Sequence, residues 1–463
     1  MIIKNFPFDT LKLGQTAELQ RLCTTDDLFV FAAATGNHNP MHLPGEDING
    51  DGKPDTTASG IFLAAMISAV LGNVLPGPGT SYHSQALTFT GHAKAGDTLL
   101  ARVTVTALAP SGIVDLDTEV IRLRDAAVMV QGKAQVQAPL RPLSYDDRDL
   151  PGLVVQTHRQ FDAILKRAQA LPALTTAVVW PDEVQALQGA LLAQAQGLIL
   201  PVLIGPTARI RALAKDIGAD LGTVQLVEAA SETAAAEQAV VLARAGKVKA
   251  IMKGHLHTDV LLRPMLDRTT GLRIGRRFTH VFVLDVPGLN HPLLVSDGAI
   301  NIAPDLTTKI DIVQNAINLA HSLGIAQPKV AVLSAVETVS TDMPSSMDAA
   351  ALSKMADRGQ ITGGLVDGPL AMDNAVSMAA ARTKGITGGV AGQADVLIVP
   401  NLDAGNILVK LLTHLAHAEA AGLVMGASVP IILTSRADGQ AARVISAALA
   451  VLQVHAQAKA GLR

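Results

Sequence analysis

The chain is poor in cysteine, in aromatic residues and in net charge. Cys23 is its one cysteine, which excludes an internal disulfide and a cluster of thiolate metal ligands. Aromatic residues make up 3% of the 463 residues and hydrophobic residues 49%, so that large cores must be mainly aliphatic. The formal net charge of −3 argues against nucleic acid as a partner.

Segments that direct a chain to a membrane are also missing. The first residues, Met1–Phe6, lack the apolar stretch of a signal peptide. No apolar run reaches the length of a membrane span before Gly, Pro or a charged residue interrupts it. The sequence therefore predicts a soluble, cytoplasmic, globular protein without membrane partners, and its length suits two to four domains.

The first part of the chain has the pattern of an α+β domain. Apolar and polar residues alternate between Thr98 and Ala138, which predicts an antiparallel sheet with one solvated face. The apolar stretch Ile61–Leu75 precedes it and predicts a buried helix. This domain is expected to cover residues 1–138. The inward positions should be Ala101, Val103, Val105, Val114, Leu116, Val120, Val128, Val130 and Val136.

The pattern changes after residue 138. Residues 139–152 hold three prolines and five charged residues, and we expect a linker over 139–153. From 154 to 463, short Val/Ile/Leu runs alternate with Ala-rich helical stretches, which predicts an α/β domain with a mainly parallel sheet, two subdomains and a cleft. The expected strands are Leu198–Ile204, Ala250–Met252, Val281–Leu284, Lys329–Leu333, Val396–Val399 and Val429–Leu433.

Several of these strands, and the strand-like run Leu293–Val295, run directly into polar or cationic residues. These are Lys253-Gly254, Ser296-Asp297, Pro400-Asn401 and Thr434-Ser435-Arg436-Ala437-Asp438, with Thr258-Asp259, Asn406 and Lys410 just beyond. Open α/β sheets bind ligands outside the carboxyl ends of their strands. We therefore expect these groups to gather along one sheet edge that suits a phosphate-bearing small molecule. Taken alone, each is typical of an ordinary turn, cap or structural ion pair.

Seven segments of the second domain, in order, carry a family resemblance. They are MKGHLHTDVLLRPML, FTHVFVLDVPG, LLVSDGAINIAPDLTTK, KVAVLSAVE, VDGPLAMDNAVS, KGITGGVAGQADVLIVPNLDAGNILVK and PIILTSRAD. They resemble the phosphate acetyl/butyryltransferases over about residues 155–455, and the residues of these segments are closer to those of the butyryl branch. The resemblance implies that a short-chain acyl-CoA and phosphate form acyl phosphate and CoA, with no tightly bound cofactor.

This chemistry implies roles for the strand-end residues. Arg436 and Lys253 would hold phosphate, and Ser435 with strand-end N–H groups would stabilise the oxyanion. The CoA sulfur needs an acid or base, which the acetyl branch links to an Asp six residues after the Arg. That position is Ala442 here, and Asp438 is the nearest carboxylate. Without cysteine in this region, we expect direct transfer in a ternary complex. The candidates for binding substrate or CoA are Gly254, Thr258, Asp259, His280, Asp297, Asn401, Asn406 and Lys410.

The N-terminal half contains a second candidate site. The apolar run Leu28–Ala34 predicts a helix that ends at Gly36, and the residues from Asn37 to His42 by themselves fit a helix cap and an Asn-Pro turn. With the Ile61–Leu75 helix, LPGPGTSYHSQALTF and AGDTL, they resemble the (R)-specific enoyl-CoA hydratases, the MaoC-like hot-dog domains, over about residues 10–138. The two halves together resemble fusions of an enoyl-CoA hydratase with a phosphate acetyltransferase.

The resemblance implies catalysis by a loop Asp and the His five residues later. His42 matches the His, but Asn37 stands at the Asp position and Ser59-Gly60 replace His-Gly. An amide cannot accept a proton at neutral pH, and loss of a general base costs about 10²–10⁴-fold in rate. We therefore favour a domain that keeps a CoA-thioester pocket, or one that is structural and oligomerises, over an active hydratase. The base could also come from His38 or the Glu46-Asp47 pair.

The resemblance also implies a homo-oligomer, a dimer or larger, because proteins of both families usually assemble in pairs. Three functions stay open. The first is a phosphate acyltransferase with a hydratase-like domain. The second is a hydratase whose C-terminal half is inert. The third is a non-catalytic regulator that binds acyl-CoA or acyl phosphate.

The loop between the two N-terminal motifs resembles part of a calcium-binding loop. Asp47, Asn49, Asp51 and Asp55 have the spacing of ligands in the first nine positions of an EF-hand. Ala58 stands where the bidentate acid belongs, and no flanking helix pair is evident. A polar loop is the favoured interpretation and a weak calcium site the alternative; no other metal is expected.

Overall fold

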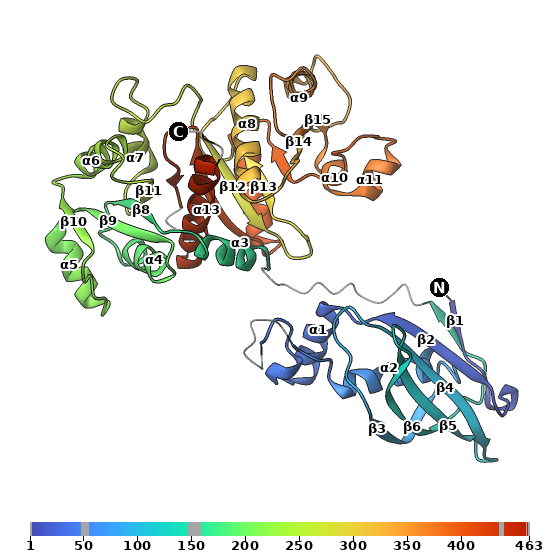
Figure 1. Ribbon diagram of the computed structural model, residues 1–463. Coiled ribbons are helices and arrows are strands. Elements are labelled where there is room, and N and C mark those ends of the chain that lie inside the picture. Colours follow the sequence, from blue (N-terminus) through green and yellow to red (C-terminus); the bar gives the residue numbers. More distant parts are fainter. Residues whose placement is uncertain (1, 48–54, 147–158, 435–438, 460, 462–463) are drawn as a thin grey trace. The chain divides into compact units, whose positions relative to one another are not determined.

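The computed structural model describes residues 2–47, 55–146, 159–434, 439–459 and 461 (Figure 1). The chain forms two compact units, Met1–Val155 and Gln156–Arg463, which are described separately.

The N-terminal unit is a five-stranded antiparallel sheet packed against one helix. Its strands follow the order β2 (Thr16–Leu22), β4 (Thr98–Leu108), β5 (Ile113–Arg122), β6 (Ala127–Gln137) and β3 (Ser81–Phe89). The expected buried helix is α2 (Gly60–Asn73), which contacts all five strands. Leu63, Ile67 and Val70 of this helix are fully buried in the core beneath the sheet. This is the predicted hot-dog-like α+β arrangement.

The expected inward positions of the sheet are buried, except Val128. The register between β5 and β6 shifts after Val120, so that Met129 is buried beside Val130 while Val128 is half-buried. Such a bulge interrupts the two-residue period that the sequence suggests.

Helix α1 (Thr25–Thr35) and two single helical turns precede the sheet's main helix. Helix α1 ends at Gly36, whose φ of 67° is the left-handed conformation that glycine adopts readily. The single turns η1 (Phe8–Thr10) and η2 (Pro40–His42) follow proline and asparagine.

Part of the expected linker belongs to this unit. Strand β7 (Ser144–Asp146) pairs with β1 (Ile2–Lys4), and the side chain of Asn5 bonds to the backbone of Arg141 and Leu143. The expectation of a linker from 139 onward was therefore wrong for residues 139–146. Prolines and charges mark an exposed segment, but they do not prevent an extended backbone from pairing at a sheet edge.

The C-terminal unit contains one eleven-stranded sheet in the order β10-β9-β8-β11-β18-β17-β12-β13-β16-β14-β15. Its strands are β8 (Leu174–Val179), β9 (Ile199–Gly205), β10 (Gln225–Glu228), β11 (Ala250–Lys253), β12 (Thr279–Asp285), β13 (Leu293–Ser296), β14 (Lys329–Leu333), β15 (Leu365–Leu370), β16 (Val396–Ile398), β17 (Glu419–Met425) and β18 (Ile431–Ile432). Most neighbours are parallel, as predicted for this α/β domain.

The middle of this sheet is antiparallel, which reverses one half against the other. Strand β17 is antiparallel to both β18 and β12, and β12 is antiparallel to β13. Strands β11 and β18 therefore point opposite to β13 and β16. The prediction that all polar strand ends share one edge was wrong, because Lys253 and Asp297 end strands that run in opposite directions.

Helices cover both faces of the sheet. They are α3 (Arg159–Gln169), α4 (Val184–Ala195), α5 (Thr207–Asp216), α6 (Glu232–Arg244), α7 (Thr258–Met265), α8 (Leu306–Ser322), α9 (Pro344–Asp357), α10 (Met372–Val376), α11 (Met378–Thr383), α12 (Leu402–His414) and α13 (Gln440–Lys459). On one face a continuous apolar core joins the strands to α3, α4, α5, α8, α9 and α13. The other face carries two separate cores, one under α6 and α7 and one under α10, α11 and α12.

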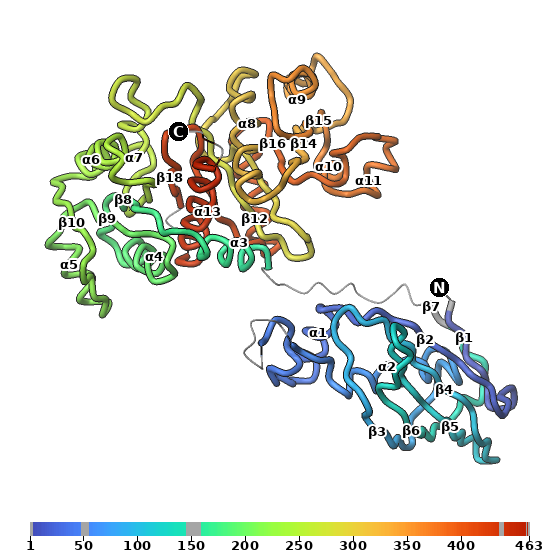
Figure 2. The backbone as a smooth tube through the Cα atoms, in the orientation of Figure 1, coloured from blue at the N-terminus to red at the C-terminus, as the bar shows by residue number. Residues whose placement is uncertain are grey.

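Helix α13 crosses the middle of the sheet and packs against β17 and β18 (Figure 2). By length and composition it could cross a membrane, contrary to the expectation that no segment could. In the fold, 61% of its apolar window is buried inside the unit. A core helix passes the same test, and the contacts of α13 are those of a core helix.

Candidate functional site

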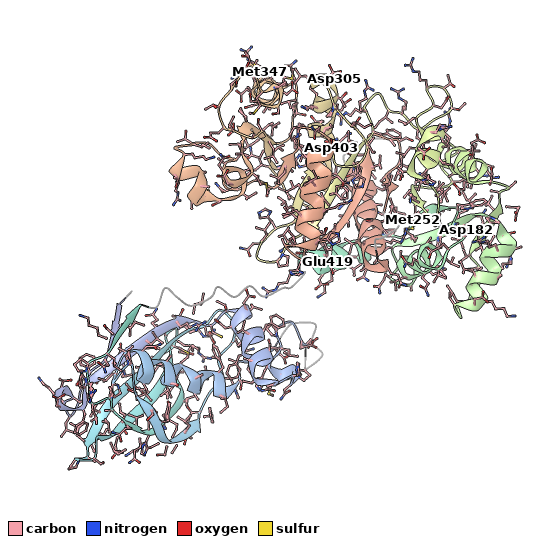
Figure 3. The ribbon with its side chains drawn as sticks, turned by 180° about the vertical axis from the view of Figure 1, so that it is seen from behind. Asp182, Met252, Asp305, Met347, Asp403 and Glu419 are labelled. Carbon is pink, nitrogen blue, oxygen red and sulfur yellow. The ribbon has the colours of Figure 1, made fainter. Side chains whose placement is uncertain are left out.

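A cavity of about 600 Å³ lies on the face that carries two separate cores. Residues from β11, β12, β17, α7, α12 and the loop after β13 line it. In Figure 3, Met252 marks β11, Asp403 the start of α12 and Glu419 the start of β17. Five residues expected at the site meet there, namely Lys253, Thr258, His280, Asn406 and Lys410.

Lys253 ends β11 and is 4% exposed. Its Nζ lies 3.5 Å from the carbonyl oxygen of Thr434, which follows β18. Because β11 and β18 are parallel neighbours, the two strand ends meet at the same edge. This geometry places a buried amine at the wall of the cavity.

Arg443 of α13 joins these two strand ends and was missed in the sequence. Its Nη1 donates to the carbonyl oxygen of Lys253 at 3.2 Å and to Oγ1 of Thr434 at 2.7 Å. Gly189 of α4 makes room, since a Cβ there would lie 2.4 Å from Cδ of Arg443. An arginine within the apolar run of a helix was the available signal, because such a cation needs partners when it is buried.

Gly254 and Asp259 have structural surroundings. A Cβ on Gly254 would lie 2.3 Å from the carbonyl oxygen of Val179, so the turn after β11 requires glycine at this close approach. Asp259 is exposed and forms an ion pair with Arg263 one turn later at 3.8 Å. Neither residue lines the cavity.

Asp297 and Asn401 shape the loops that hold the cavity's wall. The Asp297 carboxylate is buried and accepts the backbone N–H groups of Ala299, Ile300 and Asn301, at 3.0 to 3.2 Å. Asn401 is exposed and caps α12 by accepting the N–H of Ala404 at 2.9 Å. Neither Asp297 nor Asn401 lines the cavity itself.

Two glycines let α12 approach the loop after β13. A Cβ on Gly405 would lie 2.8 Å from Cα of Gly298, and one on Gly298 would lie 3.0 Å from the carbonyl carbon of Gly405. This contact brings Nδ2 of Asn406 to 3.5 Å from the carbonyl oxygen of Gly298. The cavity's wall on this side therefore depends on backbone packing that a larger residue would disturb.

The described lining is cationic or neutral. It includes Lys253 and Lys410 with His257, His280 and His414, and no Asp or Glu among the described residues that line it. A hollow of one sign raises the local concentration of oppositely charged ligands. The cavity thus favours an anion.

The residues expected to complete this site, Ser435, Arg436 and Asp438, lie outside the described residues. Their assignment, including the meeting of Arg436 with Lys253, stays a prediction. Ala442, which stands where the acetyl branch has its Asp, is half-buried in the first turn of α13.

The N-terminal candidates also come together. Asn37, His42 and Ser59 line a cavity of about 10 Å³, with apolar neighbours from α1. Nδ1 of His42 lies 2.9 Å from the carbonyl oxygen of Thr57. Because that oxygen can only accept, Nδ1 carries the proton and Nε2 is the basic nitrogen. The cavity has room for about one water.

The loop considered for calcium is only partly described. Asn49 and Asp51 lie outside the described residues, while the N–H of Asp55 donates to the carbonyl oxygen of Glu46 at 3.3 Å. Within the described part of the chain, no group of three or more His, Cys, Asp or Glu is arranged to hold a metal ion. Calcium binding by this loop stays a prediction.

Comparisons with known proteins identify both halves. Residues 230–451 match the family described as Phosphate acetyl/butaryl transferase, and residues 10–120 match the MaoC like domain. The phosphate acetyltransferase of Rhizobium meliloti is 52% identical over 63% of this chain and 93% of its own length. The phosphate butyryltransferase of Clostridium beijerinckii is 40% identical over 64% and 97%.

A solved structure shares the second half's fold. It is described as a branched-chain phosphotransacylase from Enterococcus faecalis V583, with 33% identity and a TM-score of 0.53 over 61% of this chain and 99% of that one. The chain belongs to the phosphate acetyl/butyryl transferase family, with a MaoC-like domain fused to its N-terminal side. Over the second half, the relative from Rhizobium meliloti named an acetyltransferase is more identical than the relative from Clostridium beijerinckii named a butyryltransferase, so the closeness of the seven segments to the butyryl branch stays a prediction.

Proposed function

We propose that this protein transfers a short acyl group between the sulfur of CoA and phosphate. The observation that carries the proposal is the cationic cavity of about 600 Å³, in a domain whose relatives are named phosphate acetyl- and butyryltransferases. Buried Lys253 supplies a positive charge where a phosphate dianion must be held.

In this mechanism Lys253 and Arg436 bind phosphate and direct an oxygen at the thioester carbonyl. Ser435 and neighbouring N–H groups stabilise the developing oxyanion. Thr258, Asn406 and Lys410 lie at the same cavity and hold the CoA moiety. The acyl group passes directly between the two substrates, because Cys23, the chain's single cysteine, belongs to the other unit.

Release of free thiol tests this proposal. Acetyl-, propionyl- and butyryl-CoA are incubated with the whole chain and phosphate, and the liberated thiol is measured against a reaction without phosphate. Arsenate in place of phosphate should also release thiol. If no acyl-CoA gives phosphate-dependent release while calorimetry still detects acyl-CoA binding, the chain is a regulator that binds acyl-CoA.

The N-terminal domain is proposed to bind a CoA thioester with little hydration activity. Its support is the match of residues 10–120 to the MaoC like domain, together with Asn37 in place of an acid beside the basic Nε2 of His42. Hydration of crotonyl-CoA, measured in the same preparation, separates a binding pocket from an active hydratase. We propose domains over residues 1–138 and 154–463, with residues 139–146 packed on the first.

A homo-oligomer, a dimer or larger, is proposed from the surface of α12. Ile407 and Leu411 of this helix and its C-cap residue Leu415 lie about one turn apart and are 65%, 48% and 74% exposed. Such a stripe on a helix is typical of a surface that pairs. Light scattering coupled to size-exclusion chromatography tests the assembly, and Leu411→Lys should reduce its mass. A cytoplasmic location fits a chain with one buried thiol.

A further inference from the structure

His280 occupies the floor of the cavity. It lies on β12, is 1% exposed, and its ring contacts Phe282 edge-on, with centroids 4.2 Å apart. Strand β17 runs beside it, with Val424 opposite His280 and Gly422 opposite Phe282. A Cβ on Gly422 would lie 2.6 Å from Cε1 of His280, so the imidazole leans over β17 in the space that this glycine leaves.

The imidazole therefore leans toward the side that holds Lys253. Strands β11, β18, β17 and β12 are consecutive neighbours, and the registers place Lys253 and Gly422 at the same level. Neighbouring strands are about 4.8 Å apart, so Lys253 and Phe282 are about 14 Å apart at the backbone. Lys253, His280 and Phe282 line the same cavity, together with Gly422 between them.

No carboxylate comes from the other described residues that line this hollow. Lys253 comes from β11, His257 from α7, and Lys410 and His414 from α12. Asp297 follows β13 and lies beside His280 in the register of β12 and β13. Its carboxylate accepts hydrogen bonds from the backbone N–H groups of Ala299, Ile300 and Asn301 and from Nδ2 of Asn301. His257 and His414 are exposed, which leaves His280 as the buried imidazole among the described lining residues.

We infer that His280 is the acid–base catalytic residue for the CoA sulfur, an assignment that rests on the proposed function. In the direction of thioester synthesis, neutral His280 accepts the proton of the CoA thiol. The sulfur electron pair forms the C–S bond to the acyl carbon, and the C–O bond to phosphate breaks with its pair on oxygen. The imidazolium gives its proton to that oxygen, which leaves as hydrogen phosphate. The reverse reaction returns the same proton to sulfur.

This assignment supplies the function that Ala442 cannot perform. Imidazole exchanges protons near neutral pH, which suits attack by a thiol whose own ionisation lies above neutrality. A proton acceptor is most effective when its pKa is close to the working pH.

The test compares His280→Gln with His455→Gln, a control on α13 whose ring bonds to the backbone of Val451 outside the cavity. Synthesis of acetyl-CoA from acetyl phosphate and CoA is followed, together with thermal unfolding. For His280→Gln, kcat should fall about 10²–10⁴-fold with little change in the KM for CoA. The control should keep the wild-type rate.

Chemical rescue distinguishes proton transfer from packing. In His280→Ala, added imidazole should restore part of the rate, whereas pyrazole, which has the same shape and is far less basic, should not. An unchanged rate in His280→Gln, or a loss without selective rescue by imidazole, overturns the assignment. If wild-type protein makes no acyl-CoA from either acetyl phosphate or butyryl phosphate, the proposed function fails and the assignment falls with it; if only the variants contradict expectation, the assignment alone fails.

Discussion

The imidazole of His280 lies over the Cα atom of Gly422, where a Cβ would come within 2.6 Å of Cε1 and 3.1 Å of Nε2. The same Cβ would lie 2.8 Å from the carbonyl oxygen of Val281. Gly422→Ala should therefore displace the ring while keeping it in the protein. We expect kcat for thioester synthesis to fall at least about tenfold, since small misplacements of a reacting group are costly.

Gly72→Ala is the matched control for this substitution. Gly72 lies in α2 of the other unit, and a Cβ there meets nothing within 4 Å. Alanine in a helix should raise the free energy of unfolding by about 0.5–1 kcal/mol and leave acyl transfer unchanged. Equal rates for the two alanine variants would contradict the importance of the His280 position.

The phosphate site is tested by Lys253→Met, which removes the charge and keeps most of the side chain's length. Because a buried cation faces the cavity here, the KM for phosphate should rise at least about tenfold. The measurement is thiol release from acetyl-CoA across a series of phosphate concentrations. Lys249→Met, one residue before β11 and exposed, serves as the control. An unchanged KM in Lys253→Met would place phosphate elsewhere.

The sequence predicted six of the eleven strands in the second unit's sheet, because buried strands are short runs of branched apolar residues between turns. The family was indicated separately, by the resemblance of seven ordered segments. Lys329–Leu333 was bounded correctly as β14, whereas the expected Val429–Leu433 is only Ile431–Ile432 as a strand. The direction of the strands could not be predicted, since β12 and β17 are as apolar as their parallel neighbours. The prediction that all polar strand ends share one sheet edge was wrong for this reason.

The site was only partly predictable for a related reason. Lys253 and His280 carry chemistry that is visible in their own side chains. Gly422 and Arg443 matter through what they approach in the fold, namely the His280 ring and two strand ends. Such approaches depend on tertiary packing across distant segments, which a local pattern does not contain.

Gly405→Ala should weaken acyl-CoA binding by moving α12. A Cβ at this position would lie 2.8 Å from both Cα of Gly298 and Cγ2 of Val399. The helix must shift, and overpacking of this kind typically costs about 1–3 kcal/mol of stability. We expect the KM for acyl-CoA to rise several-fold with a smaller change in kcat. Calorimetric binding of CoA checks the direction, and unchanged affinity would show that this contact does not set the cavity's wall.

The buried thiol of the N-terminal unit should make stability fall at high pH. Burial, with smaller effects from Asp27 and Asp97, raises the pKa of Cys23 from about 9 to about 11. The folded protein therefore holds the thiol proton more tightly than the unfolded chain does. Stability from this group is complete below pH 9 and is lost as pH rises from 9 to 11. Denaturant unfolding of wild type and Cys23→Ala across this range should show a steeper decline in wild type; parallel curves would contradict the shift.

Restoring a carboxylate beside His42 should create hydration activity in the MaoC-like domain. Asn37 and His42 share one small cavity, and Thr57 fixes the imidazole so that Nε2 is basic. In Asn37→Asp a proton acceptor is added, and crotonyl-CoA hydration should rise about 10²–10⁴-fold over wild type.

Asn39→Asp is the matched control, because Asn39 caps η2 and does not line the cavity. Adding His42→Ala to Asn37→Asp should remove the gained activity, since the reaction needs both groups. If Asn37→Asp hydrates crotonyl-CoA no faster than Asn39→Asp while still binding it, Ser59 and the narrow cavity prevent a productive pose. The domain would then be a CoA-thioester pocket that lacks hydratase activity for two reasons, the missing base and a cavity that does not admit a productive pose.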